Sequence, residues 1–332
     1  MTATATLEHI TLGRSLSAPE ARELARHLLD ENTPEALIAG YLTALRAKGE
    51  NGDELLGVAQ AMLAAARTLH GVPEGAVDTC GTGGDGSGTF NISTAAGLLA
   101  AACGIPVVKH GNRSITSRSG SADVIEALGL PFQTPDAAMA DKRFAFLFAP
   151  QFHPALKRVG AVRRALGMRT VFNLVGPLAN PAQPQFQLVG VADAARLADV
   201  AHALRGLGRG RAFVVHGEPG LDEATPAGPV TLLEVSPAGV QRRRISAADF
   251  GLPPCSLTDL KGGDALENAS IIRAVFRGEQ GARRDTVVLN AALVLLLTGR
   301  AADPREAAQD ASITLDSGRA LQLLAELGAS RA

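Results

Sequence analysis

Hydrophobic and polar positions divide the chain into a helical beginning and a longer part with two alternating periodicities. Up to about residue 71, apolar residues recur every three or four positions, a spacing that is typical of amphipathic helices. Ser17 and Glu20 have the spacing of a capping box, which marks the start of a helix. We therefore expect residues 1–71 to form a small all-helical domain, with a second helix after residue 33 and a third over 53–70.

From residue 72 onwards, short apolar runs alternate with segments of helical periodicity. The apolar runs cover residues 76–79, 106–109, 144–148, 187–191 and 212–216, with helical segments between them at 93–103, 121–128, 154–166 and 194–207. Strands that alternate with helices build a mostly parallel central sheet covered by helices. The end of the chain is helical again, at 267–277, 283–297 and 304–327. We expect a large α/β domain over residues 72–332, and a contribution to the helical domain from about 170–186.

Composition and charge argue against several kinds of partner. Lys and Arg number 32 against 33 Asp and Glu, so the chain lacks the basic balance that nucleic-acid binding favours. Its apolar stretches are shorter than the roughly 20 residues that span a bilayer. The first residues lack the basic and then apolar pattern of a secretion signal. We therefore expect a cytoplasmic protein with no nucleic-acid and no membrane partner.

Three cysteines, Cys80, Cys103 and Cys255, are far apart and include no C-x-x-C pair. This pattern indicates reduced thiols and neither a disulfide framework nor a zinc site. Cys80 lies beside a glycine-rich segment, so a nucleophile is one interpretation. The other interpretation is a small buried residue near the end of a strand, which is the common state of a free cysteine.

The segment from Asp78 to Thr94 carries the strongest chemical signal. Its five glycines, Gly81, Gly83, Gly84, Gly86 and Gly88, fall between a predicted strand and a helix that starts near Ser93. Without Cβ atoms the backbone can approach a ligand closely, so that its N–H groups converge on phosphate oxygens. Side-chain donors at the helix N-terminus favour an anion further. The segment predicts a phosphate site, with a mobile surface loop as the alternative; its spacing matches neither a P-loop nor a dinucleotide fingerprint.

Two further clusters follow predicted strands. The stretch from Lys109 to Asp123 combines three basic side chains with five hydroxyl side chains. In open α/β sheets ligands bind at the carboxyl ends of strands, and this density of donors suits a diphosphate. A solvated basic loop is the alternative. Asp222 and Glu223 follow the strand at 212–216 and have the hard oxygen ligands that magnesium prefers, although such a pair alone is most often a solvated turn.

The motifs GTGGD with NIST, KHGNR with SGSAD, and GLDEAT make the sequence similar to the anthranilate phosphoribosyltransferases of tryptophan biosynthesis. The similarity extends over nearly the whole chain and includes VRRALGMRTVFNLVGPLANP. It implies a helical domain hinged to an α/β domain, assembly as a homodimer, and two bound magnesium ions (Mg2+). It also implies the reaction, in which the 5-phosphoribosyl group passes from phosphoribosyl diphosphate to the amine of anthranilate and diphosphate is released.

The resemblance assigns residues to each ligand. Those implied for phosphoribosyl diphosphate are Gly81, Gly84, Asp85, Thr89, Asn91, Ser93, Thr94, Lys109, His110, Gly111, Asn112, Arg113, Ser114, Ser117 and Ser121. Those implied for anthranilate are Gly81, His110, Asn112, His153 and Arg163, and those for magnesium are Ser93, Asp222 and Glu223. No general base is assigned: His110 is one candidate, and water or the carboxylate of the acceptor are the others.

Three other functions stay open at this point. A nucleoside phosphorylase also cleaves at C1 of the sugar, but it handles a single phosphate without a metal. A non-catalytic phosphosugar-binding protein would bind the donor without turnover. Phosphoribosyl transfer to another aromatic acid is the third, because residues 130–144 form a shorter segment than the family has and Phe152 replaces a more usual tyrosine.

Overall fold

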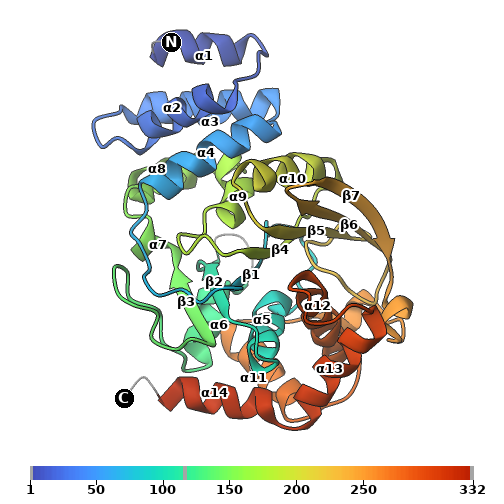
Figure 1. Ribbon diagram of the computed structural model, residues 1–332. Coiled ribbons are helices and arrows are strands. Elements are labelled where there is room, and N and C mark those ends of the chain that lie inside the picture. Colours follow the sequence, from blue (N-terminus) through green and yellow to red (C-terminus); the bar gives the residue numbers. More distant parts are fainter. Residues whose placement is uncertain (1–2, 115–117, 330–332) are drawn as a thin grey trace.

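The helices at the start of the chain lie on one side of the central sheet, and those at its end cover the other (Figure 1). The computed structural model describes residues 3–114 and 118–329. Its first four helices are α1 (Ala3–Thr11), α2 (Ala18–Leu29), α3 (Glu35–Lys48) and α4 (Gly52–Ala64). Helix α1 is not predicted from the sequence, because Ala and Thr alternate over residues 3–6 and give little helical periodicity.

Helix α4 is shorter than the predicted helix over 53–70. It ends at Ala64, and the amides of Arg67 and His70 donate instead to the carbonyls of Phe152 (2.8 Å) and Ala137 (3.0 Å). These contacts with a distant segment replace the last helical turns. Through these hydrogen bonds, the segment that connects α4 to β1 is held against residues 137–152.

Seven strands form one sheet in the order β3-β2-β1-β4-β5-β6-β7. Their bounds are β1 (Val77–Gly81), β2 (Val107–Gly111), β3 (Phe144–Phe148), β4 (Phe186–Gly190), β5 (Arg211–Gly217), β6 (Val230–Ser236) and β7 (Gly239–Ile245). Strands β1 to β5 are parallel, whereas β6 and β7 continue the sheet in antiparallel pairing. The predicted fold class is confirmed, and the antiparallel edge extends the five predicted strands.

Ten helices follow the helical bundle in the described part of the chain. They are α5 (Ile92–Ala102), α6 (Ser121–Ala127), α7 (Ala149–Phe152), α8 (Leu156–Leu166), α9 (Val171–Val175), α10 (Leu197–Gly206), α11 (Ala265–Phe276), α12 (Ala282–Leu297), α13 (Pro304–Asp316) and α14 (Arg319–Ala329). Short 3-10 turns are η1 (Gly176–Leu178), η2 (Ala194–Arg196), η3 (Ala247–Phe250) and η4 (Leu257–Leu260). The predicted helices over 154–166 and 304–327 differ from this: the first begins two residues later, and the second is divided at Gly318, where φ is 78°.

Neighbouring residues of each central strand serve two different cores. Leu188 of β4 and Phe213 of β5 pack into a core with α5 and α12, whereas Val189 and Val214 pack into a core with α4 and α10. This alternation is the pleat of a strand that is buried on both faces, and it explains the continuous apolar runs in the sequence. None of the helices in residues 3–114 and 118–329 combines the length and the apolar composition needed to cross a membrane.

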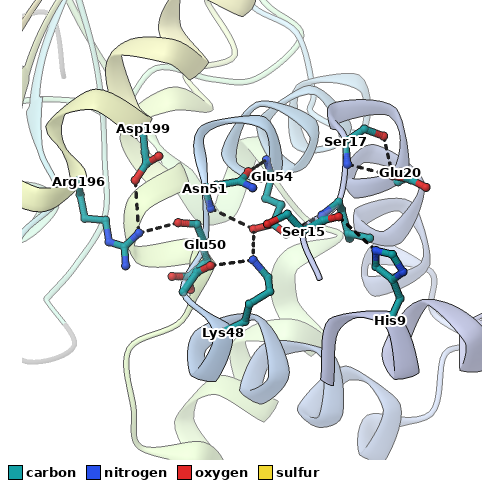
Figure 2. A network of polar contacts seen from close by, with 12 residues as sticks. His9, Ser15, Ser17, Glu20, Lys48, Glu50, Asn51, Glu54, Arg196 and Asp199 are labelled. Atoms are coloured by element: carbon teal, nitrogen blue, oxygen red, sulfur yellow. Dashed lines mark hydrogen bonds and ion pairs between the residues drawn. The ribbon is translucent and has the colours of Figure 1, made fainter. Parts of the chain in front are cut away.

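Polar contacts join the loop between α3 and α4 to the start of α10 (Figure 2). Glu54 is fully buried; it pairs with Lys48 (2.9 Å) and accepts a hydrogen bond from the Leu16 amide (3.0 Å). From the other side Arg196 donates to the carbonyl of Glu50 (2.6 Å). Helices α8 and α9 also contact α3, on the bundle side of the sheet. The division of the domains at residue 71, with 170–186 contributing to the bundle, stays a prediction.

Candidate active site

The glycine-rich loop leaves the end of β1 and leads into α5. Gly83 and Gly84 have φ values of 66° and 71°, which other residues rarely adopt, and both are exposed. A Cβ atom on Gly81 would collide with the carboxylate of Asp222, and one on Gly190, at the end of β4, would collide with the Asp222 backbone. Glycine is therefore required where β1, β4 and the turn after β5 approach one another.

Asp222 and Glu223 lie in the turn after β5 and contact the glycine loop and α5. Asp222 accepts a hydrogen bond from the Gly83 amide (2.6 Å), and Glu223 accepts one from the Ser93 amide (3.1 Å). Burial raises the pKa of both carboxyl groups, and the neighbouring Asp85 raises the pKa of Asp222 further. The pair is therefore part of the sheet edge and not a solvated turn.

Lys109 brings a positive charge to the same place from β2. Its side chain is buried, and its ammonium donates to the Thr79 carbonyl and to Ser93 Oγ (3.2 Å). The Lys109 charge opposes the rise in the pKa of Glu223. The structure thus brings Ser93, Lys109 and the two carboxylates together where β1, β2 and β5 end.

These groups fit a magnesium ion. Two carboxylates and a hydroxyl are hard oxygen ligands, and carboxylates with raised pKa values are stabilised by a cation that neutralises them. Among the described residues, no group of three or more His, Cys, Asp or Glu side chains forms a complete cage for a metal. Magnesium usually takes its other ligands from water and substrate phosphates.

Three other residues predicted to bind phosphoribosyl diphosphate lie where the glycine loop leads into α5. Thr89 Oγ1 is hydrogen-bonded to Ser87 Oγ (3.1 Å), and Asn91 Oδ1 accepts from the Asn268 amide group (2.9 Å). Thr94 is fully buried, and its hydroxyl has no hydrogen-bond partner within the described residues. Of the predicted donors on the first turn of α5, Ser93 is thus the more accessible one.

The basic cluster after β2 is organised by Asp123. Its carboxylate accepts hydrogen bonds from the amides of Ser114 (3.2 Å) and Gly120 (2.9 Å), and it pairs with Arg113 (2.7 Å). Arg113 also pairs with Glu126 (2.9 Å). The guanidinium of Arg113 is therefore paired with two carboxylates. The cation of this cluster that lies near Asp222 and Glu223 is the Lys109 ammonium.

Elsewhere in this cluster, the backbone after β2 lies close to the side chain of Ser121. A Cβ atom on Gly111 would collide with the Ser121 hydroxyl, which donates to the carbonyl of Asn112 (3.4 Å). Asn112 itself is exposed, and its side chain accepts from the Arg113 amide (2.8 Å). Ser117 lies outside the described residues.

Arg163 and Arg164 are adjacent on α8 and have different surroundings. Arg163 is half-buried, lies over the ring of Phe172 (5.6 Å) and donates to Asn173 Oδ1 (3.2 Å). Burial lowers the pKa of Arg163. Arg164 is exposed. The residue predicted for the acceptor is thus the one that faces α9.

His110 and His153 form an edge-to-face pair whose ring centroids lie 5.1 Å apart. Burial, with His153 as a second cause, lowers the pKa of His110 to about 3. Burial also lowers the pKa of His153, whose Nε2 lies 2.9 Å from the Ala179 carbonyl. Nε2 of His110 is buried and has no hydrogen-bond partner within the described residues. A group with this pKa is neutral at pH 7 and is a weak general base.

Cys80 is buried in β1, and its thiol lies 3.9 Å from the Pro177 carbonyl. Burial raises the pKa of the thiol well above its ordinary value. Because the thiolate is the reactive form, these observations favour the packed residue over the nucleophile.

Two cations beside the glycine loop are absent from the predicted site. Arg169, just before α9, donates to the carbonyls of Gly84 (3.0 Å) and Gly83 (3.1 Å). Lys261, before α11, donates to the carbonyl of Ser87. Arg169 and Gly84 are 85 positions apart, and Lys261 and Ser87 are 174 apart, so no local pattern in the sequence joins them.

Family models match both parts of the chain. The helical bundle domain of a glycosyl transferase family matches residues 4–66, and the a/b domain of a glycosyl transferase family matches residues 73–321. Together these matches define a glycosyltransferase with a helical N-terminal domain and a large α/β domain.

Individual relatives narrow this class. The chain is 44% identical over 325 residues to the anthranilate phosphoribosyltransferase of Syntrophomonas wolfei, covering 97% of this chain and 95% of that protein. The crystal structure of the Thermus thermophilus enzyme is 39% identical, covers 100% of both chains and has a TM-score of 0.89. The Saccharomyces cerevisiae enzyme is 27% identical, with TM-scores of 0.86 in complex with PRPP (phosphoribosyl diphosphate) and Mg, covering 98% of both chains, and 0.84 with 4-fluoroanthranilate, covering 99% and 98%. The chain belongs to the anthranilate phosphoribosyltransferases, pentosyl-transferring enzymes of tryptophan biosynthesis.

Proposed function

We propose that this chain transfers the 5-phosphoribosyl group from phosphoribosyl diphosphate to the amine of anthranilate with the help of magnesium, giving N-(5-phosphoribosyl)anthranilate and diphosphate. The observation that carries the proposal is the convergence of the glycine loop, Ser93, Lys109, Asp222 and Glu223 at one edge of the sheet. Such a site can bind a diphosphate through backbone N–H donors, a cationic side chain and ligands for a metal ion. The ligands of the yeast relative support the same choice of donor and acceptor.

On the donor side, the bond between C1 of the ribose and a diphosphate oxygen breaks, and the oxygen keeps the electron pair. The glycine-loop N–H groups and the Lys109 ammonium stabilise this charge, because fixed positive groups act most where charge develops. Magnesium, held by Ser93, Asp222 and Glu223, supplies further positive charge at the departing diphosphate when bound. We include two such ions in the proposal.

On the acceptor side, the amine of anthranilate attacks C1 from the opposite face, and its nitrogen then loses a proton to water or to the acceptor's own carboxylate. Arg163 is the residue we assign to that carboxylate, because a planar guanidinium matches it in a way that lysine does not. His110, neutral and with a buried ring nitrogen free of partners in the described chain, offers the acceptor one hydrogen bond. The pKa of His110 argues against its role as the base.

Assembly as a homodimer and a cytoplasmic location complete the proposal. The three cysteines are free thiols, which supports a reducing compartment.

The experiment that tests this function combines the purified protein with magnesium, phosphoribosyl diphosphate and a series of aromatic acids. It follows the loss of anthranilate fluorescence for anthranilate and the release of diphosphate for every acid, and a separate assay supplies nucleosides with inorganic phosphate. We expect turnover with anthranilate that requires both magnesium and the donor. Turnover with a different aromatic acid alone would change the acceptor. Phosphate-dependent cleavage of nucleosides would replace the proposal with a phosphorylase, and tight donor binding without turnover would replace it with a binding protein.

A further inference from the structure

Arg169 holds two consecutive carbonyl groups of the glycine loop. Its Nη1 donates to the Gly84 carbonyl (3.0 Å) and its Nη2 to the Gly83 carbonyl (3.1 Å). A guanidinium presents its N–H donors as a rigid planar fork, so this contact fixes the direction of both carbonyls and not only the position of one atom.

The direction of a carbonyl determines the direction of the next amide. In a planar trans peptide the C=O of one residue and the N–H of the following residue point to opposite sides. With the Gly83 and Gly84 carbonyls turned toward Arg169, the amides of Gly84 and Asp85 are turned away from it. Within the described chain neither amide donates a hydrogen bond, whereas the Gly83 amide is engaged by Asp222 (2.6 Å). Two successive N–H groups that face one side form a concave site for an anion.

The backbone that carries Arg169 is itself held in place. Thr170, the next residue, is buried, and its amide donates to Asn173 Oδ1 (2.9 Å) at the start of α9. The same oxygen accepts from Arg163 (3.2 Å). Arg169 therefore extends from a fixed point on the acceptor side to an exposed loop on the donor side.

The side chain of Arg169 also limits what can replace Gly84. A Cβ atom on Gly84 would collide with the Arg169 guanidinium, and φ at this position is 71°. A side chain at position 84 would therefore need a left-handed backbone conformation and a shift of the Arg169 guanidinium.

We propose that Arg169 is a positioning residue for the donor: by holding the Gly83 and Gly84 carbonyls it directs the Gly84 and Asp85 amides toward the diphosphate. The proposal rests on the proposed function of the glycine loop and adds a residue of the segment between α8 and α9 to it. Arg169 acts through the backbone, so its charge alone is not sufficient.

The test compares Arg169→Ala, Arg169→Lys and, as the matched control, Arg164→Ala, which removes an exposed arginine from α8. Calorimetry measures binding of inorganic diphosphate with magnesium, and of anthranilate, to each variant. Loss of two charge-assisted hydrogen bonds predicts a Kd for diphosphate about ten- to a hundredfold higher for Arg169→Ala. The Kd for anthranilate and the melting temperature should stay at the wild-type values, and Arg164→Ala should match the wild type throughout.

Two further measurements separate positioning from a general structural or charge effect. Arg169→Lys keeps the charge but cannot hold two carbonyls in the same way, so its diphosphate Kd should stay well above the wild-type value. Added methylguanidinium should restore diphosphate binding to Arg169→Ala. Unchanged binding by Arg169→Ala, full affinity in Arg169→Lys or no rescue would overturn the inference alone. A wild-type protein that binds no diphosphate would overturn the proposed function together with it.

Discussion

Arg163 and Arg164 differ by one position on α8, which turns their side chains by about 100° around the helix axis. Arg163 lies against Phe172 and Asn173, and Arg164 is exposed. Arg163→Ala should raise the KM for anthranilate about ten- to a hundredfold, as expected for a lost charge-assisted contact, and leave the donor KM nearly unchanged. Steady-state kinetics measures both KM values, and the control variant Arg164→Ala should change neither of them. A donor-specific defect in Arg163→Ala, or a sensitive Arg164, would place the acceptor elsewhere.

The acidic pair of Asp222 and Glu223 gives a second prediction at the scale of residues. Replacing Asp222 with Asn and Glu223 with Gln keeps size and removes both charges. Because the oxygens that remain are weaker magnesium ligands, activity should fall by about tenfold or more and require more magnesium. A magnesium titration of the rate measures this, with Asp310→Asn on the exposed face of α13 as the control for a change of charge. An unchanged titration curve in the double variant would remove the metal assignment.

At the scale of elements, burial of His110 near the end of β2 gives a pH dependence. Its pKa is about 3 in the folded chain against 6.5 for an ordinary histidine, so protonation favours the unfolded state. The stabilisation is present above pH 6.5 and is lost as the pH falls toward 3, by about 1.4 kcal/mol per pH unit. Urea denaturation should therefore show that the wild type loses about 2 kcal/mol more than His110→Gln between pH 7 and pH 5. Parallel losses in the two proteins would contradict the burial argument.

The same scale shows what the sequence could and could not predict. Strands β1 to β5 could be predicted because both of their faces are buried, so each contains a short cluster of apolar residues between helical segments. Strand β7 lies at the edge of the sheet and exposes most of its residues, which leaves no such signal. The end of α4 depends on hydrogen bonds from Arg67 and His70 to a distant segment. The glycine loop could be predicted because it is a local pattern in the sequence. The hydrogen bond from Arg169 to the Gly84 carbonyl joins residues 85 positions apart, so only the fold creates it.

At the scale of the whole molecule, the expected homodimer is a separate prediction. The chain has a mass of 34.2 kDa, so light scattering after size-exclusion chromatography should give about 68 kDa, twice that value. Dilution should show whether the dimer persists at the concentrations used for kinetics. A mass of one chain at every concentration would contradict the prediction without touching the site.

The buried Glu54 connects parts of the helical bundle, because its carboxylate contacts Lys48 of α3 and the Leu16 amide before α2. This network lies beside the contact of Arg196 with Glu50 (Figure 2). Removing Glu54 leaves Lys48, whose side chain is only 6% exposed, as an uncompensated buried charge. Such a loss costs about 3–5 kcal/mol, so Glu54→Ala should lower the free energy of unfolding by that amount.

Glu23→Ala removes an exposed ion pair with Arg26 and should change the free energy of unfolding by less than about 1 kcal/mol. Because Arg196 ties the loop after α3 to α10, we expect bundle and sheet to unfold in one transition, with the midpoint shifted in Glu54→Ala. Denaturation followed by circular dichroism measures both. Within the described chain, none of the hydrogen-bond or ion-pair partners of Glu54 or Glu23 is a partner of Asp222 or Glu223, so turnover at low temperature should stay at the wild-type level in both variants. Equal midpoints for Glu54→Ala and Glu23→Ala would show that the buried pair does not stabilise the bundle.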